Sequence, residues 1–298
     1  MSFKKIIKII FIILLIFLKN ENNIITRKKK KHELNKNIFT FWEPHESMPG
    51  YLVLCIKTWK KYLPKYEIKI LDYKSSQDYL GRSLFSSIIC KKMTLPVQVD
   101  AIRVAILQKF GGIWLDADTI ILNDHLFKKL RDFELIMLGD EKKKTQNIGF
   151  IFARNNSVII KQWLEEIIKN VHIYKQSMKK SNINNTTLNS WYYLGNGIVN
   201  RLVNNFTGKQ FIRLNRDKIK ALPELIFFKN TSHNAIEKYQ KLYFQKGDPK
   251  IIINNSKSII MLHNSWTPSK YKGMSENEFL NQDILLSKLL AYLLNKKI

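Results

Sequence analysis

The sequence predicts an α/β fold in which a mixed central sheet is flanked by helices. Short apolar segments alternate with longer ones whose apolar residues recur at helical spacing. The alternation begins as strand, helix and strand at residues 38–42, 51–61 and 66–71, which is the first half of a nucleotide-binding sheet. A length of 298 residues with 45% hydrophobic residues suits one large domain with a buried core, not a disordered chain.

Residues 95–122 form the centre of the predicted fold. We expect a helix from Pro96 to about Phe110, because proline suits a first helical turn and apolar residues follow at helical spacing. Two glycines end it, since glycine tolerates the left-handed backbone that a helix end requires. The apolar residues 113–115 then predict a short buried strand, and two aspartates follow it.

The elements after this centre follow from the same periodicities. The pattern predicts extended segments and helices as follows: strands at 119–122, 133–138, 147–153 and 259–262, and helices over 157–174, after 195–197 and over 276–295. The Asn- and Lys-rich residues 175–190 predict a surface loop. Residues 206–250 carry no clear pattern.

The two aspartates, Asp116 and Asp118, are the principal candidates for chemistry. In a strand, positions i and i+2 point the same way, so we expect both carboxylates on one side. Two anions so close repel each other unless a cation lies beside them, and oxygen-only ligands suit Mg²⁺ or Mn²⁺. An Asp-x-Asp string also occurs as an ordinary polar turn, so the interpretation depends on the helix, glycines and strand that precede it.

Asp100 and Arg103 lie three residues apart on the predicted helix and therefore share one of its faces. An acid and a guanidinium in that position can hold sugar hydroxyls and a phosphate oxygen. In open α/β sheets, ligands bind beyond the carboxyl ends of the strands, which is where the aspartate pair is expected.

Four pieces of this segment form a specific combination: Asp100-x-x-Arg103, Gly111-Gly112, the strand 113–115 and Asp116-x-Asp118. The combination resembles the signature of the DXD-containing glycosyltransferase family 32, over about residues 36–270. The resemblance implies a GT-A-type nucleotide-sugar transferase fold. It also implies transfer of a hexose from a nucleotide diphosphate sugar to a glycan or lipid-linked hydroxyl, with Mn²⁺ or Mg²⁺ and with retention of anomeric configuration.

The resemblance implies a role for each central residue. Asp118 would contact the metal directly, and Asp116 would reach it through a water or bind ribose and sugar hydroxyls. Asp100 and Arg103 would orient the donor sugar, and Arg103 would also offset charge on the diphosphate. The metal would stabilise the leaving diphosphate as a Lewis acid.

Two positions in the first half match the family more loosely. Trp42 ends the first strand, where the family places an aromatic residue near the nucleotide base, although Glu43-Pro44 replaces the usual glycine-containing continuation. Asn147 stands at the start of a strand that lines the donor or acceptor sugar in the family. A core tryptophan and an ordinary polar residue at a strand start are the structural alternatives.

Three positions in the second half complete the implied site. Gly197 marks the entry to the acceptor cleft, although the family's usual Gly-Pro is absent here. His263 and Trp266 resemble the C-terminal His/Trp motif, which makes His263 a candidate metal ligand and Trp266 a candidate substrate contact. A structural histidine is the alternative for His263.

Residues 1–19 combine early lysines with an apolar run from Ile9 to Leu18. The run is shorter than a spanning helix and no small-residue cleavage site follows it, so we expect an uncleaved membrane anchor or an interfacial helix. Residues 20–36 are a basic linker, and residues 37–298 the catalytic domain. The basic cluster after the run favours a cytoplasmic catalytic domain, with the Golgi lumen as the alternative in a eukaryote.

The formal net charge of +26, from 50 Lys and Arg against 24 Asp and Glu, favours anionic partners. A membrane surface and sugar nucleotides are such partners, and nucleic acid is another. No nucleic-acid-binding motif and no basic helix interleaved with aromatic residues accompanies the charge, so we expect no nucleic-acid partner. The abundance of Lys, Asn and Ile also fits an AT-rich coding sequence.

Two other functions stay open at the level of sequence. A strand followed by Asp116-x-Asp118 also matches the nucleophile motif of haloacid-dehalogenase-like phosphatases, but that class carries it on the first strand, and two predicted strands precede it here. A non-catalytic carbohydrate-binding membrane protein would hold a structural cation with the same carboxylates. A phosphatase releases phosphate from monoesters, a transferase releases nucleotide diphosphate, and a binding protein releases neither.

Overall fold

The structure is a computed structural model that describes residues 35–140, 142–155, 157–179, 193–204, 206 and 211–296. Contacts divide the chain into residues 1–34 and residues 35–298, and the second unit holds all the elements below. The predicted anchor, residues 1–19, and nearly all of the predicted linker lie outside the described residues. Among the helices that are described, none is long and apolar enough to cross a membrane.

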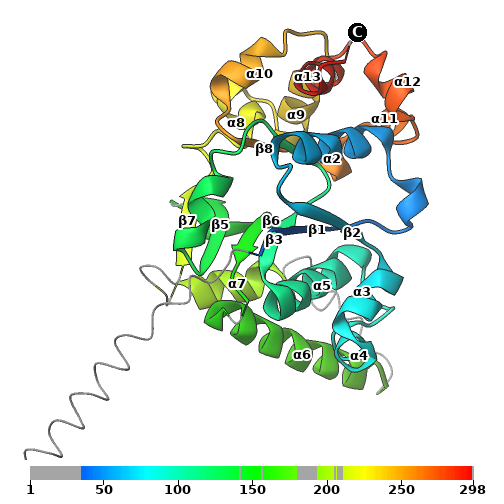
Figure 1. The fold of residues 1–298 in the computed structure, drawn as a ribbon, viewed down its shortest axis with the longest axis vertical. Helices are drawn as coiled ribbons and strands as arrows, with labels where there is room; N and C mark the ends of the chain where they lie inside the picture. Colours follow the sequence, from blue (N-terminus) through cyan, green and yellow to red (C-terminus); the bar gives the residue numbers. More distant parts are fainter. Residues whose placement is uncertain are drawn as a thin grey trace, which may run out of the picture. The chain divides into compact units, whose positions relative to one another are not determined.

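A six-stranded mixed sheet forms the middle of this unit, as the sequence predicts (Figure 1). In spatial order its strands are β2 (Glu67–Leu71), β1 (Asn37–Phe41), β3 (Gly112–Leu115), β6 (Thr145–Ala153), β5 (Leu135–Asp140) and β7 (Phe211–Asn215). β1 is parallel to β2 and β3, and β7 is parallel to β5, whereas β6 is antiparallel to both of its neighbours.

The register of β1 and β3 places the candidate residues at one edge of the sheet. Phe39 of β1 pairs with Trp114 of β3 in parallel. The carboxyl ends of the two strands therefore meet, and Trp42 and Asp116 follow them at the same edge. This is the edge at which open α/β sheets bind their ligands.

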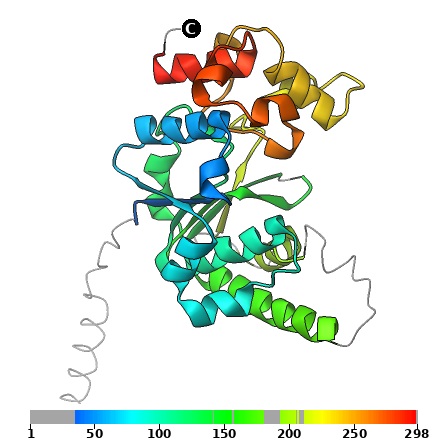
Figure 2. The ribbon, with the colours of Figure 1, turned by 90° about the vertical axis from the view of Figure 1, so that its right-hand side faces the viewer.

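Helices cover both sides of the sheet in Figures 1 and 2. One side carries α3 (Tyr73–Leu80), α4 (Arg82–Ile88), α5 (Leu95–Phe110), α6 (Val158–Lys179) and α7 (Asn196–Val203), which share one apolar core with the sheet. The other side carries α2 (Gly50–Tyr62), α8 (Pro223–Phe227), α9 (Ala235–Tyr243), α10 (Lys250–Asn255), α11 (Ser269–Lys272), α12 (Glu276–Leu280) and α13 (Leu285–Leu294). A two-stranded sheet of β4 (Thr119–Ile121) and β8 (Ile259–Met261) lies on this second side.

The end of α5 confirms the predicted role of the two glycines. Gly111 and Gly112 have φ values of +64° and +103°, which residues with a side chain rarely adopt. A Cβ atom on Gly111 would lie 2.5 Å from the backbone nitrogen of Asn155, and one on Gly112 would lie 2.7 Å from the carbonyl oxygen of Asn37. Both positions therefore require glycine for conformation and for space, and the turn delivers β3 into the sheet.

Two predicted elements differ in the structure. The predicted helix over 276–295 is two helices, because the chain between α12 and α13 turns and Leu285 donates its N–H to the Gln245 carbonyl at 2.7 Å. The predicted loop over 175–190 is wrong for its first residues, since α6 continues to Lys179. Lys, Gln and Met, which make up most of this extension, are good helix formers. Residues 180–192 lie outside the described part of the chain.

Candidate functional site

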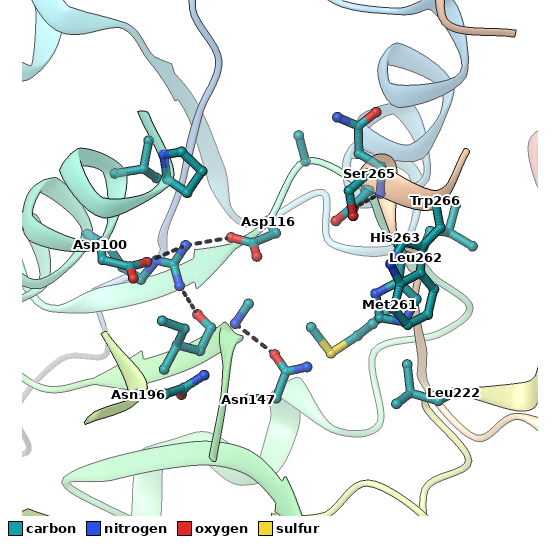
Figure 3. A pocket seen from close by; sticks show the side chains of 18 of the residues that line it. Asp100, Asp116, Asn147, Asn196, Leu222, Met261, Leu262, His263, Ser265 and Trp266 are labelled. Atoms are coloured by element: carbon teal, nitrogen blue, oxygen red, sulfur yellow. Dashed lines mark hydrogen bonds and ion pairs between the residues drawn. The ribbon is translucent and has the colours of Figure 1, made fainter. Parts of the chain in front are cut away.

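A cavity of about 900 Å³ opens at the carboxyl ends of β1 and β3 (Figure 3). Residues from β1, α5, the β3–β4 turn, β6 and the segment after β8 line it. Nearly all of the predicted site residues lie on its wall: Trp42, Asp100, Arg103, Asp116, Asp118, Asn147, His263 and Trp266. The fold therefore brings together residues that are more than 200 positions apart in the sequence.

One carboxylate oxygen of Asp116 accepts two hydrogen bonds from neighbouring side chains. Arg103 Nη2 lies 3.0 Å from Asp116 Oδ1, and Trp114 Nε1 donates to the same oxygen at 2.9 Å. The Arg103 guanidinium is itself fixed, because Nη1 donates to the Ile148 carbonyl at 2.6 Å and the group lies over the Trp114 ring at 5.0 Å. Both donors use Oδ1, which leaves Oδ2 for the cavity.

Asp100 is the most deeply buried acid of the predicted set. Its exposed fraction is 3%, and its Oδ1 lies 3.4 Å from Arg103 Nη2. Its Oδ2 has no hydrogen-bond partner among the described residues. Burial raises the pKa of Asp100 to about 7, although the nearby Arg103 opposes this shift.

Asp118 lies in a turn and not in a strand, so the expected strand alternation is wrong. Thr119 donates its N–H to the Asp116 carbonyl at 3.0 Å, which closes the turn between β3 and β4. Asp118 Oδ2 accepts the Asn264 N–H at 2.8 Å, and Oδ1 accepts no hydrogen bond from another residue in the described part of the chain. Burial, and then the charge of Asp116, raise the pKa of Asp118 to about 7.

His263, Trp266 and Asn147 lie on the wall around the two aspartates (Figure 3). The His263 ring packs on Trp266 with 3.8 Å between ring centroids, and His263 Nε2 lies 3.5 Å from Glu224 Oε1. Asn147 Oδ1 accepts the Gly149 N–H at 2.8 Å. The Trp42 side chain lines the cavity, and its indole nitrogen is buried without a hydrogen-bond partner among the described residues.

Gly197 does not line the cavity, because it is exposed on the first turn of α7. The neighbouring Gly195 has the tighter contact with the site. A Cβ atom on Gly195 would lie 2.2 Å from Asp100 Oδ2 and 2.9 Å from Ile148 Cδ1. The glycine that this loop needs for the candidate site is therefore Gly195.

We expect Gly195→Ala to lower the free energy of unfolding by about 1–3 kcal/mol, because the new methyl group overpacks Asp100. The matched control is Gly197→Ala, two residues away, which adds the same methyl group at an exposed helical position and should change the free energy by less than about 1 kcal/mol. Urea denaturation of both variants measures the difference. Equal effects would mean that Gly195 is not confined by Asp100.

The described residues of the cavity could hold a metal ion only if a bound ligand supplied further ligand atoms. Among the described residues, no group of three or more His, Cys, Asp or Glu side chains is arranged to hold an ion. Asp116 and Asp118 nevertheless offer one free oxygen each, and Mg²⁺ commonly binds one or two carboxylates together with substrate phosphates and waters. The donor set therefore fits Mg²⁺ or Mn²⁺ bound with a diphosphate.

The charge of the cavity wall is opposite to that of the chain. The whole sequence has 50 Lys and Arg against 24 Asp and Glu. The cavity has three Lys or Arg residues against five carboxylates: Arg103, Lys143 and Arg216 against Glu43, Asp100, Asp116, Asp118 and Glu224. The wall therefore has more acidic than basic residues, although the chain as a whole is basic.

Sequence reasoning missed three polar residues on the cavity wall. Glu224, Gln146 and Asn196 are buried, and each has at least one polar atom without a hydrogen-bond partner among the described residues. Buried polar groups are normally paired, so these unpaired atoms make the three residues candidates for contacts with a ligand. Asn196 stood inside the Gly195-Asn196-Gly197 string and could have been singled out, whereas Glu224 lies in the stretch without a pattern.

Residues 4–264 of the chain match the family described as capsular polysaccharide synthesis protein. The chain belongs to this family. The predicted resemblance to glycosyltransferase family 32 stays a prediction. The matched residues include the whole of the central sheet and every candidate site residue except Trp266.

Parts of the chain are also similar to proteins with a glycosyltransferase name. An alignment of 153 positions, which covers 44% of the chain and 39% of the relative, shows 26% identity to Glycosyltransferase afumC of Aspergillus fumigatus. An alignment of the same length shows 26% identity to O-glycosyltransferase braB of Annulohypoxylon truncatum and covers 36% of it. The chain thus matches under two fifths of either relative.

One solved structure, named PaToxG Glycosyltransferase, superposes on 70% of this chain and 78% of its own with a TM-score of 0.38 and 16% identity. A likeness at that TM-score carries no argument about function.

Proposed function

We propose that this member of the capsular polysaccharide synthesis family is a metal-dependent glycosyltransferase. It would transfer a hexose from a nucleotide diphosphate sugar to a hydroxyl of a glycan or lipid-linked acceptor. The observation that carries the proposal is the Asp116–Asp118 turn, which presents one free carboxylate oxygen from each residue to a cavity at the ligand-binding edge of the sheet. The similarity to two named glycosyltransferases supports it.

The wall residues suit the separate parts of a sugar nucleotide. Trp42 offers an unused indole N–H at the end of β1, where a nucleoside would lie. Asp100 and Asn196 offer unpaired buried oxygens, which suit sugar hydroxyl groups. Asp116 and Asp118 would hold Mg²⁺ or Mn²⁺ against the diphosphate, and the bound metal would stabilise the negative charge that develops on this leaving group.

Arg103 would act by keeping Asp116 in place. Its two nitrogens Nη1 and Nη2 are committed to the Ile148 carbonyl and the Asp116 carboxylate. The guanidinium also keeps positive charge beside Asp100, which limits the repulsion between two acids in the same wall. A fixed carboxylate needs no reorganisation when the substrate binds.

Two further parts of the proposal concern the cellular location of the enzyme and the stereochemistry of transfer. We propose a membrane-associated enzyme whose catalytic domain faces the cytoplasm, on the charge distribution around residues 1–31. Retention of anomeric configuration follows from the family 32 resemblance. The anomeric proton of a labelled product, observed by NMR at early times, distinguishes retention from inversion.

The proposed function is tested by nucleotide release. The full chain is incubated with a panel of UDP- and GDP-sugars and Mn²⁺, with and without EDTA. We expect nucleotide diphosphate from at least one donor, and at least a tenfold loss of release with EDTA that added Mn²⁺ restores. Release of inorganic phosphate from phosphomonoesters would favour the phosphatase, and no release together with no metal-dependent nucleotide binding would contradict the proposed site.

A further inference from the structure

Glu224 is a buried acid on the cavity wall that the proposed reaction does not use. Its exposed fraction is 0%, and neither carboxylate oxygen accepts a hydrogen bond of good geometry from a described residue, although the Tyr243 hydroxyl lies close enough to interact with it. The nearest charged or ionisable nitrogen is His263 Nε2, 3.5 Å from Glu224 Oε1. A carboxylate that is removed from water without a charged partner destabilises the folded state. Its presence here requires a reason.

Backbone hydrogen bonds bring Glu224 and His263 together. The segment before α8 runs along β8, since Lys257 donates to the Ile219 carbonyl at 3.2 Å and Met261 donates to the Ala221 carbonyl at 2.9 Å. Glu224 follows this segment in the first turn of α8, and His263 follows β8. Backbone hydrogen bonds between these two segments therefore hold the Glu224 and His263 side chains close together.

The His263 ring is fixed on several sides. It packs on Trp266 and lies edge-to-face against Tyr239, with 5.6 Å between centroids. Its carbonyl oxygen accepts N–H groups from Trp266 and Thr267, so the backbone is fixed too. With Nε2 toward Glu224, the other ring nitrogen Nδ1 points in a different direction. His263 lines the cavity, and the adjacent Asn264 donates its N–H to Asp118.

We propose that Glu224 is a positioning residue whose carboxylate, 3.5 Å from His263 Nε2, favours the tautomer with its proton on Nε2 and thereby leaves Nδ1 unprotonated and available to the ligand in the cavity. A carboxylate behind an imidazole selects the tautomer and the orientation of the ring, and this is a recurrent arrangement behind histidines that contact metals or phosphate-bound metals. The inference rests on the proposed function for the ligand class, the metal–diphosphate end of a sugar nucleotide. The Glu224–His263 arrangement can be tested without turnover.

The first test reads the tautomer of His263 directly. The full chain is labelled with ¹⁵N-histidine, and His263→Asn assigns the signal of this residue. Without metal at pH 8, we expect the wild-type signal to show the proton on Nε2, and Glu224→Gln to show a mixture of both tautomers. A proton on Nδ1 in the wild type would overturn the inference, whatever substrate the protein uses.

The second test asks whether Glu224 acts through His263. We expect Glu224→Gln to weaken the binding of Mn²⁺ with UDP or GDP about tenfold by calorimetry, as loss of the carboxylate behind a ligating histidine does. In a His263→Asn background the same substitution should change this affinity by less than about twofold. An equal loss in both backgrounds would contradict a positioning role.

Tyr243→Phe is the matched control for packing. The Tyr243 hydroxyl is buried beside Glu224, and burial with the charge of Glu224 raises the pKa of Tyr243. Its removal takes away the other group that interacts with Glu224 but leaves the Glu224–His263 pair, so we expect an unchanged tautomer and unchanged affinity if Glu224 acts through His263. If no donor is turned over, the proposed function fails, whereas the tautomer result still decides the inference.

Discussion

Asp118→Asn is expected to reduce metal-dependent nucleotide release by about 10³-fold, which corresponds to about 4 kcal/mol of transition-state stabilisation. The substitution removes the charge that would hold the metal but keeps an oxygen that can still accept the Asn264 N–H. The turn should therefore fold as before. The free energy of unfolding of the protein should not fall, since burial and the charge of Asp116 already disfavour an ionised Asp118. Initial rates with Mn²⁺ and the donor found in the panel measure the effect.

The matched control for this prediction is Asp124→Asn. Asp124 lies six residues further along the chain, pairs with Lys128 at the surface and does not line the cavity. It should retain at least about half of the wild-type rate, since exposed ion pairs contribute little. If Asp118→Asn kept an EDTA-sensitive rate equal to that of the control, Asp118 would not be a metal ligand.

The central segment was predictable because its signals are local. Pro96, two glycines and an apolar strand lie within twenty residues, and each acts through the backbone of its own neighbourhood. α3 was missed although its signal is also local: Asp72 and Ser75 form a reciprocal capping box at 2.7 and 2.9 Å. Sequence reasoning could have found that helix.

The remaining differences arise from long-range contacts. The break between α12 and α13 depends on the bond from Leu285 to Gln245, and no local pattern encodes it. Glu224 gains its importance only because Ala221 pairs with Met261, forty residues away. In the same way, Trp114 looked like a plain apolar strand residue, and only the fold shows that its indole nitrogen bonds Asp116.

The second large effect is expected from Arg103→Met. Arg103 is 4% exposed and is the only Lys or Arg in an ion pair with Asp100 among the described residues. Its removal leaves the buried Asp100 carboxylate without a cation, and breaking a buried pair by removing one partner costs about 3–5 kcal/mol. Asp116 contributes less, because its side chain is 40% exposed and water can solvate it. Urea denaturation at pH 8 should show the loss.

A double variant separates folding from function at this position. Asp100→Leu combined with Arg103→Met replaces the buried pair by apolar side chains, which is often neutral for stability. We expect it to recover most of the lost free energy of unfolding but none of the nucleotide release, because Asp116 has lost its fixed donor and the sugar has lost Asp100. Arg201→Met, which breaks an exposed pair with Glu166, should cost under about 1 kcal/mol. Recovery of activity with stability would mean that Arg103 serves the fold alone, whereas a double variant as unstable as the single one would show that the cost comes from lost packing and not from the unpaired charge of Asp100.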